Sequence, residues 1–243
     1  MTSLSRLGGL FLLWVIALLQ GCATTQVSQD PRDPWETTNR RVYAFNDAVD
    51  AAVARPVAQG YEKVVPSPVR TGVSNFLSNL SDVWTLANSV LQLKPQVAAE
   101  TLMRVNINTF FGLGGLLDIA SEMRIPHHRE DFGQTLAVWG VPSGPYVVLP
   151  LLGPSTVRDT AALGADMGVD VPGRIWNSNT SSSLTVLRVV DTRASLLKTV
   201  DAVRAAALDP YSFVRDAYLQ KRRNDVYDGN PPVNFDFTDP DMP

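Results

Sequence analysis

The sequence is short of the residues that hold disulfides and metals. Cys22 is the only cysteine among 243 residues, so no intramolecular disulfide can form. The two histidines, His127 and His128, are neighbours, and neighbouring side chains point in different directions on a helix or a strand. With no further cysteine or histidine to complete a tetrahedral site, we expect no metal and no cofactor.

Basic residues are not in excess either. The chain has 21 Lys and Arg against 24 Asp and Glu, a formal net charge of -3. Nucleic-acid-binding proteins carry a basic face, so we expect no nucleic acid among the partners, and no polybasic patch is present for anionic lipid. The composition, 45% hydrophobic and 19% charged, is that of a globular protein with one large domain or two small ones.

The motifs of common enzymes are missing as well. The sequence has no G-x-S-x-G elbow, no HExxH and no P-loop. Residues 140–144 (GVPSG) have the wrong spacing for the elbow, and residues 112–115 (GLGG) depart from the dinucleotide fingerprint and follow a helical pattern. His127 or His128 could still join a catalytic triad from their charged loop, but the sequence favours a protein that is not an enzyme.

The N-terminus has the pattern of a secretory signal. Arg6 supplies a positive start, Leu10–Leu19 is an apolar run, and Gln20-Gly21-Cys22 follows it. This end resembles the lipobox of bacterial lipoproteins, which implies removal of residues 1–21 and lipid attachment to Cys22. The alternative is an ordinary signal peptide that happens to end near a cysteine.

Residues 22–32 are polar and predict a flexible lipidated tether. One acyl chain binds a membrane only marginally, but the three chains of a lipoprotein anchor it stably. Because Ala23 rather than aspartate follows Cys22, the resemblance to lipoprotein sorting in Gram-negative bacteria implies the outer membrane.

Prolines and cap residues divide residues 33–224 into the helices of a single domain. Asp33 as N-cap, followed by Pro34 and Glu36, predicts the start of a first helix, which Arg55-Pro56 should interrupt. Ser67-Pro68 begins a second helix and Pro95 a third. The first helix has an apolar stripe whose residues recur at spacings of three and four: Trp35, Thr38, Val42, Phe45, Val49 and Ala52.

The helix that begins at Ser67 has an unusual polar face. Between Thr71 and Leu93 the only formal charge is Asp82, whereas a solvated helix usually carries more Lys and Glu. Such a neutral, hydrogen-bonding face suits a wet groove or channel, but it equally suits a polar face buried inside a helical bundle. The channel-lining candidates are Ser74, Asn75, Ser78, Asn79 and Asn88.

The apolar stretch Val105–Ala120 is interrupted by Gly112, Gly114 and Gly115. A helix that crosses a bilayer needs about 20 apolar residues, so this stretch is too short to span. It is either a buried core helix followed by a turn or a segment that dips into lipid without crossing it.

The C-terminal half predicts further helices. Four prolines within residues 140–154 predict an extended, polyproline-like strap, since they exclude a regular helix and a central strand. Ser155 or Thr156 should cap a helix that runs toward Met167, and a loop should cover residues 171–183. One long helix is predicted over Leu184–Leu208, a last one from Asp209-Pro210, and an acidic disordered tail over residues 225–243. The fold class predicted is all-α.

Short motifs along nearly the whole mature chain, in the right order, carry a resemblance to one known family. They are Asp33-Pro34-Trp35-Glu36, Asn39-Arg40, Phe45-Asn46, Arg55-Pro56, Pro68-Val69-Arg70, Asn75-Phe76, Asn79-Leu80, Asn108-Thr109, Gly112-Leu113-Gly114-Gly115, Asp118-Ile119-Ala120, Phe132-Gly133-Gln134-Thr135-Leu136, Trp139-Gly140, Gly144-Pro145-Tyr146, Leu149-Pro150, Gly153-Pro154, Arg158-Asp159, Asp209-Pro210-Tyr211 and Arg215-Asp216-Ala217-Tyr218. They resemble the MlaA (VacJ) family of outer-membrane lipoproteins.

That resemblance implies a ring-like array of amphipathic helices in the periplasm-facing leaflet of the outer membrane, with an amphipathic channel. It implies removal of mislocalised phospholipid from the outer leaflet and transfer to the periplasmic lipid carrier MlaC, in contact with trimeric porins. The alternative is a structural or adaptor lipoprotein that only holds porins or carriers in place. The resemblance also places Val105–Ala120 inside the membrane, which makes Gly112, Gly114 and Gly115 candidates for a flexible hinge beside the channel.

Overall fold

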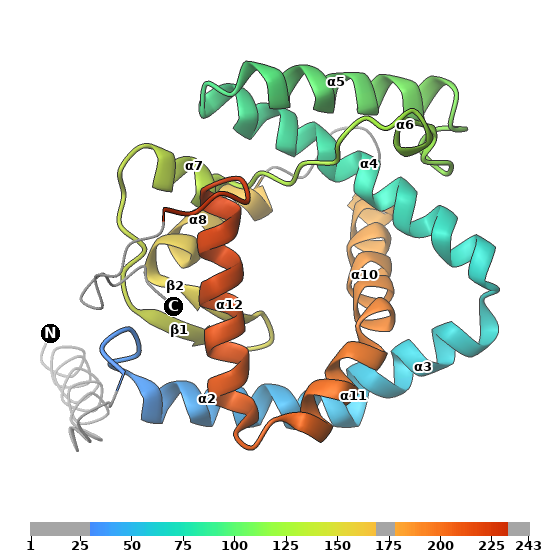
Figure 1. Ribbon diagram of the computed structural model, residues 1–243. Helices are drawn as coiled ribbons and strands as arrows, with labels where there is room; N and C mark the ends of the chain where they lie inside the picture. Colours follow the sequence, from blue (N-terminus) through green and yellow to red (C-terminus); the bar gives the residue numbers. More distant parts are fainter. Residues whose placement is uncertain (1–29, 169–177, 233–243) are drawn as a thin grey trace, which may run out of the picture.

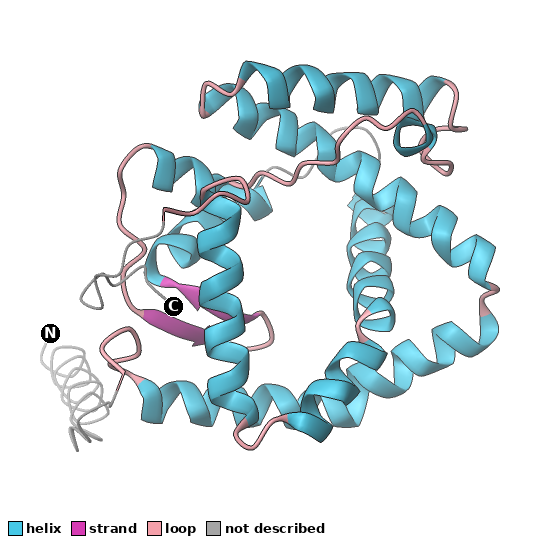
Figure 2. Ribbon diagram, in the orientation of Figure 1, coloured by secondary structure: helices cyan, strands magenta, loops and turns pink. Residues whose placement is uncertain are grey.

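The computed structural model describes residues 30–168 and 178–232. Helices dominate, in chain order α2 (Glu36–Val49), the π-helix η1 (Asp50–Ala54), α3 (Arg55–Val64), α4 (Ser67–Leu91), α5 (Pro95–Phe110), α6 (Ile119–Glu122), α7 (Phe132–Val138), α8 (Val157–Gly168), α10 (Ser178–Ser195), α11 (Leu197–Ala206) and α12 (Pro210–Val226). Between α7 and α8 lie two strands, β1 (Tyr146–Leu149) and β2 (Gly153–Thr156) (Figure 2). The predicted all-α class is confirmed apart from this hairpin. The predicted signal peptide and Cys22 lie outside the described residues.

Figure 1 shows the helices arranged around a central region that no described element crosses. The run α2–η1–α3 forms one edge, the paired α4 and α5 the opposite edge, and α10 lies across from α12 with the hairpin. Ion pairs fasten the edges together: Arg193 on α10 pairs with Asp50 on η1 at 2.6 Å, and Arg204 on α11 reaches the same carboxylate at 3.3 Å. The buried apolar residues of the described chain form two small clusters, one of Ala58, Ala194 and Leu197 between α3, α10 and α11, and one of Tyr146, Val148 and Tyr211 between the hairpin and α12.

The usual placement of polar and apolar side chains is reversed in much of the molecule. On α4 the buried side chains include Asn79, Asp82, Thr85, Asn88 and Ser89, while apolar residues of the same helix are exposed (Val69, Val83, Val90 and Leu91). A protein in water gains nothing by exposing so many apolar side chains, so this distribution indicates an apolar environment around the outside.

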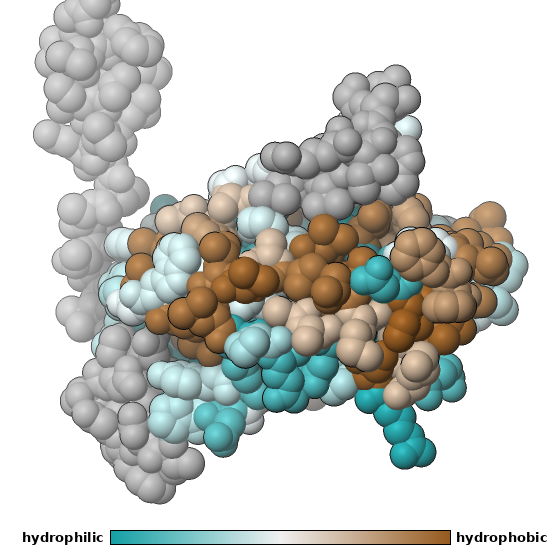
Figure 3. Space-filling view, turned by 90° about the horizontal axis from the view of Figure 1, so that it is seen from above, coloured by the Kyte–Doolittle hydropathy of each residue, from teal (hydrophilic) through white to brown (hydrophobic). Residues whose placement is uncertain are grey.

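The apolar stripe of the first helix is exposed at its aromatic residues. Trp35 and Phe45 are about half exposed, and the one buried residue of α2 is the polar Asn39. Figure 3 shows a belt of hydrophobic residues on the face that includes α5, with hydrophilic residues gathered along one side of the belt. In the described part of the chain no helix is both long and apolar enough to cross a membrane.

Two predicted helix boundaries in this region are also wrong. Asp33 does not cap α2, which begins at Glu36, because its buried carboxylate accepts hydrogen bonds from Asn39 Nδ2 at 2.8 Å and from the hydroxyl of Tyr211. Arg55-Pro56 does not interrupt the helix, since η1 leads directly into α3. A π-turn before Pro56 accommodates the missing proline N–H without a break in the chain direction.

The strap predicted over residues 140–154 is in part an antiparallel hairpin, which corrects that prediction. Tyr146 is opposite Thr156, and Leu149 is opposite Gly153. Both strands of a two-stranded sheet are edge strands, where proline is tolerated, so Pro154 in β2 does not prevent pairing. Asn39 joins the hairpin to α2: its Nδ2 donates to Tyr146 O at 3.1 Å and its Oδ1 accepts from Val148 N at 2.9 Å.

The helix predicted over Leu184–Leu208 is two helices, α10 and α11, separated at Leu196. At the break Ser195 Oγ donates to Thr192 O at 2.8 Å and competes with the backbone hydrogen bonds of the helix. Helix α10 already begins at Ser178, inside the loop predicted over residues 171–183, of which residues 171–177 lie outside the described residues.

The last helix begins as predicted. Asp209 caps α12 by accepting from Tyr211 N at 3.2 Å, as Thr156 caps α8 by accepting from Asp159 N at 3.2 Å. Helix α12 continues to Val226, two residues into the predicted acidic tail, and Asp228 pairs with Lys94 at 2.5 Å. Residues 233–243 of that tail lie outside the described residues.

Candidate functional site

A polar cavity of about 500 Å3 lies between α4, α10, the α6–α7 loop and α8. We call it the α4–α10 cavity. Three of the predicted channel-lining residues, Ser74, Asn75 and Ser78, face it. The other lining residues are Leu77, Leu80, Ser81, Asp82, Trp84, Thr85, Asp118, His127, Arg129, Glu130, Asp166, Arg188, Asp191 and Thr192.

Asn79 and Asn88, the other two candidates, do not line this cavity. Asn88 is fully buried, donates to Trp84 O at 3.0 Å and accepts from Thr135 Oγ1 at 2.7 Å, which joins α4 to α7. Asn79 donates to Thr109 Oγ1 at 3.1 Å and joins α4 to α5. The polar face of α4 is therefore divided: one part lines the cavity, and the other is the buried polar face that the sequence equally allowed.

The cavity is not neutral, contrary to the lining that the sequence suggested. Asp82, 2% exposed, accepts from His127 Nε2 at 3.0 Å, and Asp166 accepts from Trp84 Nε1 at 2.8 Å. Burial raises the pKa of Asp166, although the hydrogen bond from Trp84 opposes that rise. Asp191 accepts from Tyr61 OH at 3.1 Å. Each of these carboxylates already has a donor from the surrounding wall.

The sequence did not identify most of the charged residues of the cavity as candidates, because they come from segments outside α4. Arg129 lies in the α6–α7 loop and Arg188 on α10, about 60 residues further along the chain. Asp82 alone gave a signal, as the single charge in a long neutral stretch of α4.

Ser78, His127 and Asp82 meet in this cavity, which tests the triad that the sequence left open. Ser78 Oγ lies 3.3 Å from His127 Nε2, and Asp82 Oδ1 lies 3.0 Å from the same nitrogen. In a catalytic triad the carboxylate orients the imidazole through Nδ1 while Nε2 takes the serine proton. Here both contacts use Nε2, so the arrangement is not that of a triad.

The two adjacent histidines serve different helices, as their spacing predicts. His127 contacts α4, whereas His128 Nε2 lies 2.6 Å from Glu100 Oε2 on α5. Among the described residues no group of three or more His, Cys, Asp or Glu side chains is placed to hold a metal ion.

The glycine-punctuated stretch is the end of α5 and a tight turn. Helix α5 stops at Phe110, and Phe110, Phe111 and Leu113 are each at least 70% exposed at the tip. The apolar tip is consistent with contact with lipid, and the backbone beneath it is hydrogen-bonded: Gly115 N donates to Asn108 O at 2.8 Å and Leu117 N to Gly112 O at 2.9 Å.

The three hinge candidates differ in how their surroundings constrain them. A Cβ at Gly112 would lie 2.2 Å from Leu117 O, and one at Gly115 would lie 2.8 Å from Asn79 Nδ2. Gly114, with φ of +75°, has nothing within 4 Å of such an atom. Close packing therefore requires glycine at 112 and 115, whereas at 114 only the backbone conformation does.

A buried network holds this turn against α5. Asp118 accepts from Arg104 Nη2 at 3.0 Å and from Asn108 Nδ2 at 3.0 Å, and Asn108 Oδ1 accepts from Ala120 N at 2.9 Å. Burial opposes ionisation of Asp118, but the hydrogen bonds from Ser121 and Asn108 and the charge of Arg104 outweigh it and lower its pKa to about 2.

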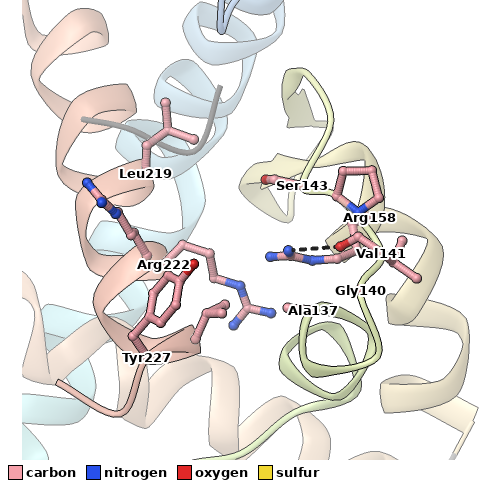
Figure 4. Close-up of a pocket in the computed structure, with 11 residues that line it drawn as sticks. Ala137, Gly140, Val141, Ser143, Arg158, Leu219, Arg222 and Tyr227 are labelled. Atoms are coloured by element: carbon pink, nitrogen blue, oxygen red, sulfur yellow. Dashed lines mark hydrogen bonds between the residues drawn. The ribbon is translucent and has the colours of Figure 1, made fainter. Parts of the chain in front are cut away.

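A second recess, of about 310 Å3, lies between α12 and the chain after α7. Figure 4 shows Leu219, Arg222 and Tyr227 on one side of it and Ala137, Gly140, Val141 and Ser143 on the other. Two of its three arginines are in ion pairs: Arg222 bridges Asp131 at 2.6 Å and Asp159 at 2.9 Å, and Arg158 pairs with Asp159 at 3.1 Å. The third, Arg223, donates to Pro232 O at 2.7 Å. The ion pairs beside this recess join α12 to α7 and α8.

Comparison with known proteins gives consistent matches. The family model described as MlaA lipoprotein matches residues 31–225. The chain is 38% identical over 213 residues to the intermembrane phospholipid transport system lipoprotein MlaA of Escherichia coli strain K12, covering 84% of this chain and 82% of that protein. It is 36% identical to the protein of the same name from Haemophilus influenzae, covering 90% and 89%.

The fold also matches a solved structure. A chain from work on the structural basis for maintenance of bacterial outer membrane lipid asymmetry superposes with a TM-score of 0.69 at 34% identity. The match covers 82% of this chain and 99% of that one, so it includes nearly all of the described elements.

Proposed function

The chain belongs to the MlaA lipoprotein family, and from this membership we propose that it transports phospholipid between membranes. In this proposal it removes mislocalised phospholipid from the outer leaflet of the outer membrane and passes it to the periplasmic carrier MlaC. The result is maintenance of outer-membrane lipid asymmetry.

The reversed polarity of the helices is the observation that supports this function. Apolar side chains are exposed around the outside, while polar and charged side chains enclose the α4–α10 cavity. An apolar exterior can remain among acyl chains, and a polar cavity can shield a headgroup on its way through the apolar region. A helical protein that folds in water has the opposite arrangement.

The free-energy cost of exposing acyl chains to water favours direct transfer of the lipid to a carrier protein. Bringing a phospholipid into water exposes about 30 methylene groups at about 0.8 kcal/mol each, on the order of 20 kcal/mol or more. No polar cavity of this size could offset that cost, so the acyl chains must stay in lipid or enter a second apolar cavity. A docked carrier such as MlaC would supply the second cavity.

The proposed anchor is a lipidated Cys22 in the periplasm-facing leaflet of the outer membrane. Its support is the lipobox-like sequence and the family description as a lipoprotein. Cys22→Ser should abolish incorporation of labelled palmitate, and a variant that still incorporates the label would refute this assignment.

We propose that the protein lies in contact with trimeric porins. A test must then distinguish a transporter from a structural or adaptor lipoprotein. Both readings predict contact with porins, but only a transporter needs the cavity to be open. Ser74→Trp combined with Thr192→Trp places two bulky rings into the cavity from α4 and α10. Thr71→Trp with Thr199→Trp, at exposed positions outside the cavity lining on α4 and α11, is the matched control.

The assay is complementation of a Gram-negative strain that lacks its own MlaA protein. Surface phospholipid, detergent sensitivity and porin co-purification are measured for each variant. We expect the cavity variant to lose lipid removal while it still co-purifies with porin, and the control to retain both. Full complementation by the cavity variant would favour the adaptor.

A further inference from the structure

Two guanidinium groups face the α4–α10 cavity without a carboxylate partner among the described residues. Arg129 forms no ion pair there within 4.0 Å, and neither does Arg188, although both line a cavity that also holds carboxylates. The nearby Arg104, in contrast, pairs with Asp118 at 3.0 Å. The cavity therefore contains two guanidinium groups without an ion-pair partner among the described residues, beside five carboxylates that also line it.

Arg188 shows this most clearly. Its one side-chain hydrogen bond in the described structure is long, from Nη2 to Leu77 O at 3.5 Å, although a guanidinium has five N–H donors. The side chain is exposed to solvent at the cavity, and its partial desolvation there lowers its pKa. An anion in the cavity could accept hydrogen bonds from the N–H donors that Leu77 leaves unused.

The carboxylates of the cavity form no ion pair with these two arginines, because they accept hydrogen bonds from other side chains of the cavity wall. Glu130 accepts from Gln92 at 2.9 Å and from Lys94 at 3.2 Å, and Asp82 and Asp166 accept from His127 and Trp84. Asp191 accepts from Tyr61 OH at 3.1 Å and Asp118 pairs with Arg104 at 3.0 Å, and none of these carboxylates forms an ion pair with Arg129 or Arg188. In the second recess Arg222 is held by Asp131 and Asp159, and Arg223 donates to Pro232 O at 2.7 Å.

We propose that Arg129 and Arg188 bind the phosphate of a phospholipid headgroup in the α4–α10 cavity, an assignment that rests on the proposed transport function. Guanidinium groups recognise phosphate through paired N–H donors in a planar fork, which gives both affinity and orientation. A headgroup held by its phosphate has its acyl chains free to remain in the surrounding lipid. The two arginines come from different segments, so both contribute only when the cavity is formed.

Titration calorimetry with the full-length protein in detergent tests the site directly. The probes are dihexanoyl phosphatidylethanolamine, dihexanoylglycerol, which lacks the phosphate, and inorganic phosphate. Arg129→Gln with Arg188→Gln removes both charges at positions exposed to solvent. Arg41→Gln removes one charge from an exposed position on α2, outside the cavity, as the control.

We expect the phospholipid to bind the wild type, the diacylglycerol to bind much more weakly, and the control to match the wild type. The double variant should bind the phospholipid about a hundredfold more weakly, roughly tenfold for each charge-assisted contact. An unchanged affinity in the double variant, or equal binding of the diacylglycerol, would overturn the proposal. Binding of inorganic phosphate without the lipid would overturn the assignment to a headgroup.

Failure of this site is distinguishable from failure of transport. Wild-type complementation of surface phospholipid tests the transport function alone. If the wild type complements but the double variant binds lipid normally, transport stands and the phosphate site is wrong. If the wild type does not complement, the transport function fails whatever the calorimetry shows.

Discussion

Replacement of Asp118 by asparagine tests whether the glycine turn is held to α5 by charge. Asp118 accepts from Arg104 Nη2 at 3.0 and 3.1 Å, and the Arg104 side chain is 3% exposed. Among the described residues the other carboxylate near Arg104 is Asp82, whose Oδ2 is 3.8 Å from Nε. Asp118→Asn keeps the shape of the side chain but leaves the charge of buried Arg104 with only this more distant carboxylate, beside its hydrogen bonds to Ser121 Oγ and Ile125 O.

The size of the effect follows from two contributions. A carboxyl with a pKa of about 2 in the fold, against an ordinary 3.8, stabilises the folded state by at most about 2.4 kcal/mol at neutral pH. Because the Asp118 side chain is 30% exposed, screening by water reduces this to about 1–2 kcal/mol. The weakened hydrogen bonding of buried Arg104 adds about 1–3 kcal/mol. We expect a loss of about 3 kcal/mol.

Thermal unfolding in detergent micelles at pH 7, followed by circular dichroism, measures this loss. For a domain of this size about 3 kcal/mol lowers the Tm by roughly 6–12 °C. Asp225→Asn is the control, because the Asp225 carboxylate pairs with the largely exposed Lys221 on α12 and should contribute less than about 0.5 kcal/mol. A Tm for Asp118→Asn no lower than that of the control would refute the reasoning.

Two further predictions concern the hinge and acid stability. Gly115→Ala should lower the Tm, because its Cβ would displace Asn79. Gly114→Ala, in contrast, should keep the protein level but impair lipid removal if the turn is a hinge. Normal lipid removal in Gly114→Ala would contradict the hinge. Arg222 lowers the pKa of Asp131 and of Asp159 against the effect of burial. Carboxylates with lowered pKa values stabilise the fold fully above their unfolded pKa of about 4. That stabilisation is lost as the pH falls through their lower folded pKa values, so the Tm should drop mainly below about pH 4. Arg222→Gln should reduce this drop, and a main loss of Tm above pH 5 would contradict the prediction.

The sequence by itself determined most of the helices and the family. Pro95 begins α5 and Ser67-Pro68 begins α4, because proline fits only the first turn of a helix and marks its start. Asp209 and Thr156 cap their helices as their positions predict. These are local effects, which depend on a few neighbouring residues and can be read from them.

Only the tertiary structure decided which face of each helix is covered and which charges meet. Amphipathic periodicity locates two faces but does not say which one meets protein, so the Asn79–Asn88 face of α4 proved buried while Ser74 and Ser78 line a cavity. Arg129 and Arg188 are far apart in sequence, and nothing local marks them as neighbours of one cavity. The N-cap predicted at Asp33 failed for the same reason, since Asn39 and the distant Tyr211 use its carboxylate. Long-range contacts outweighed local preference at each of these positions.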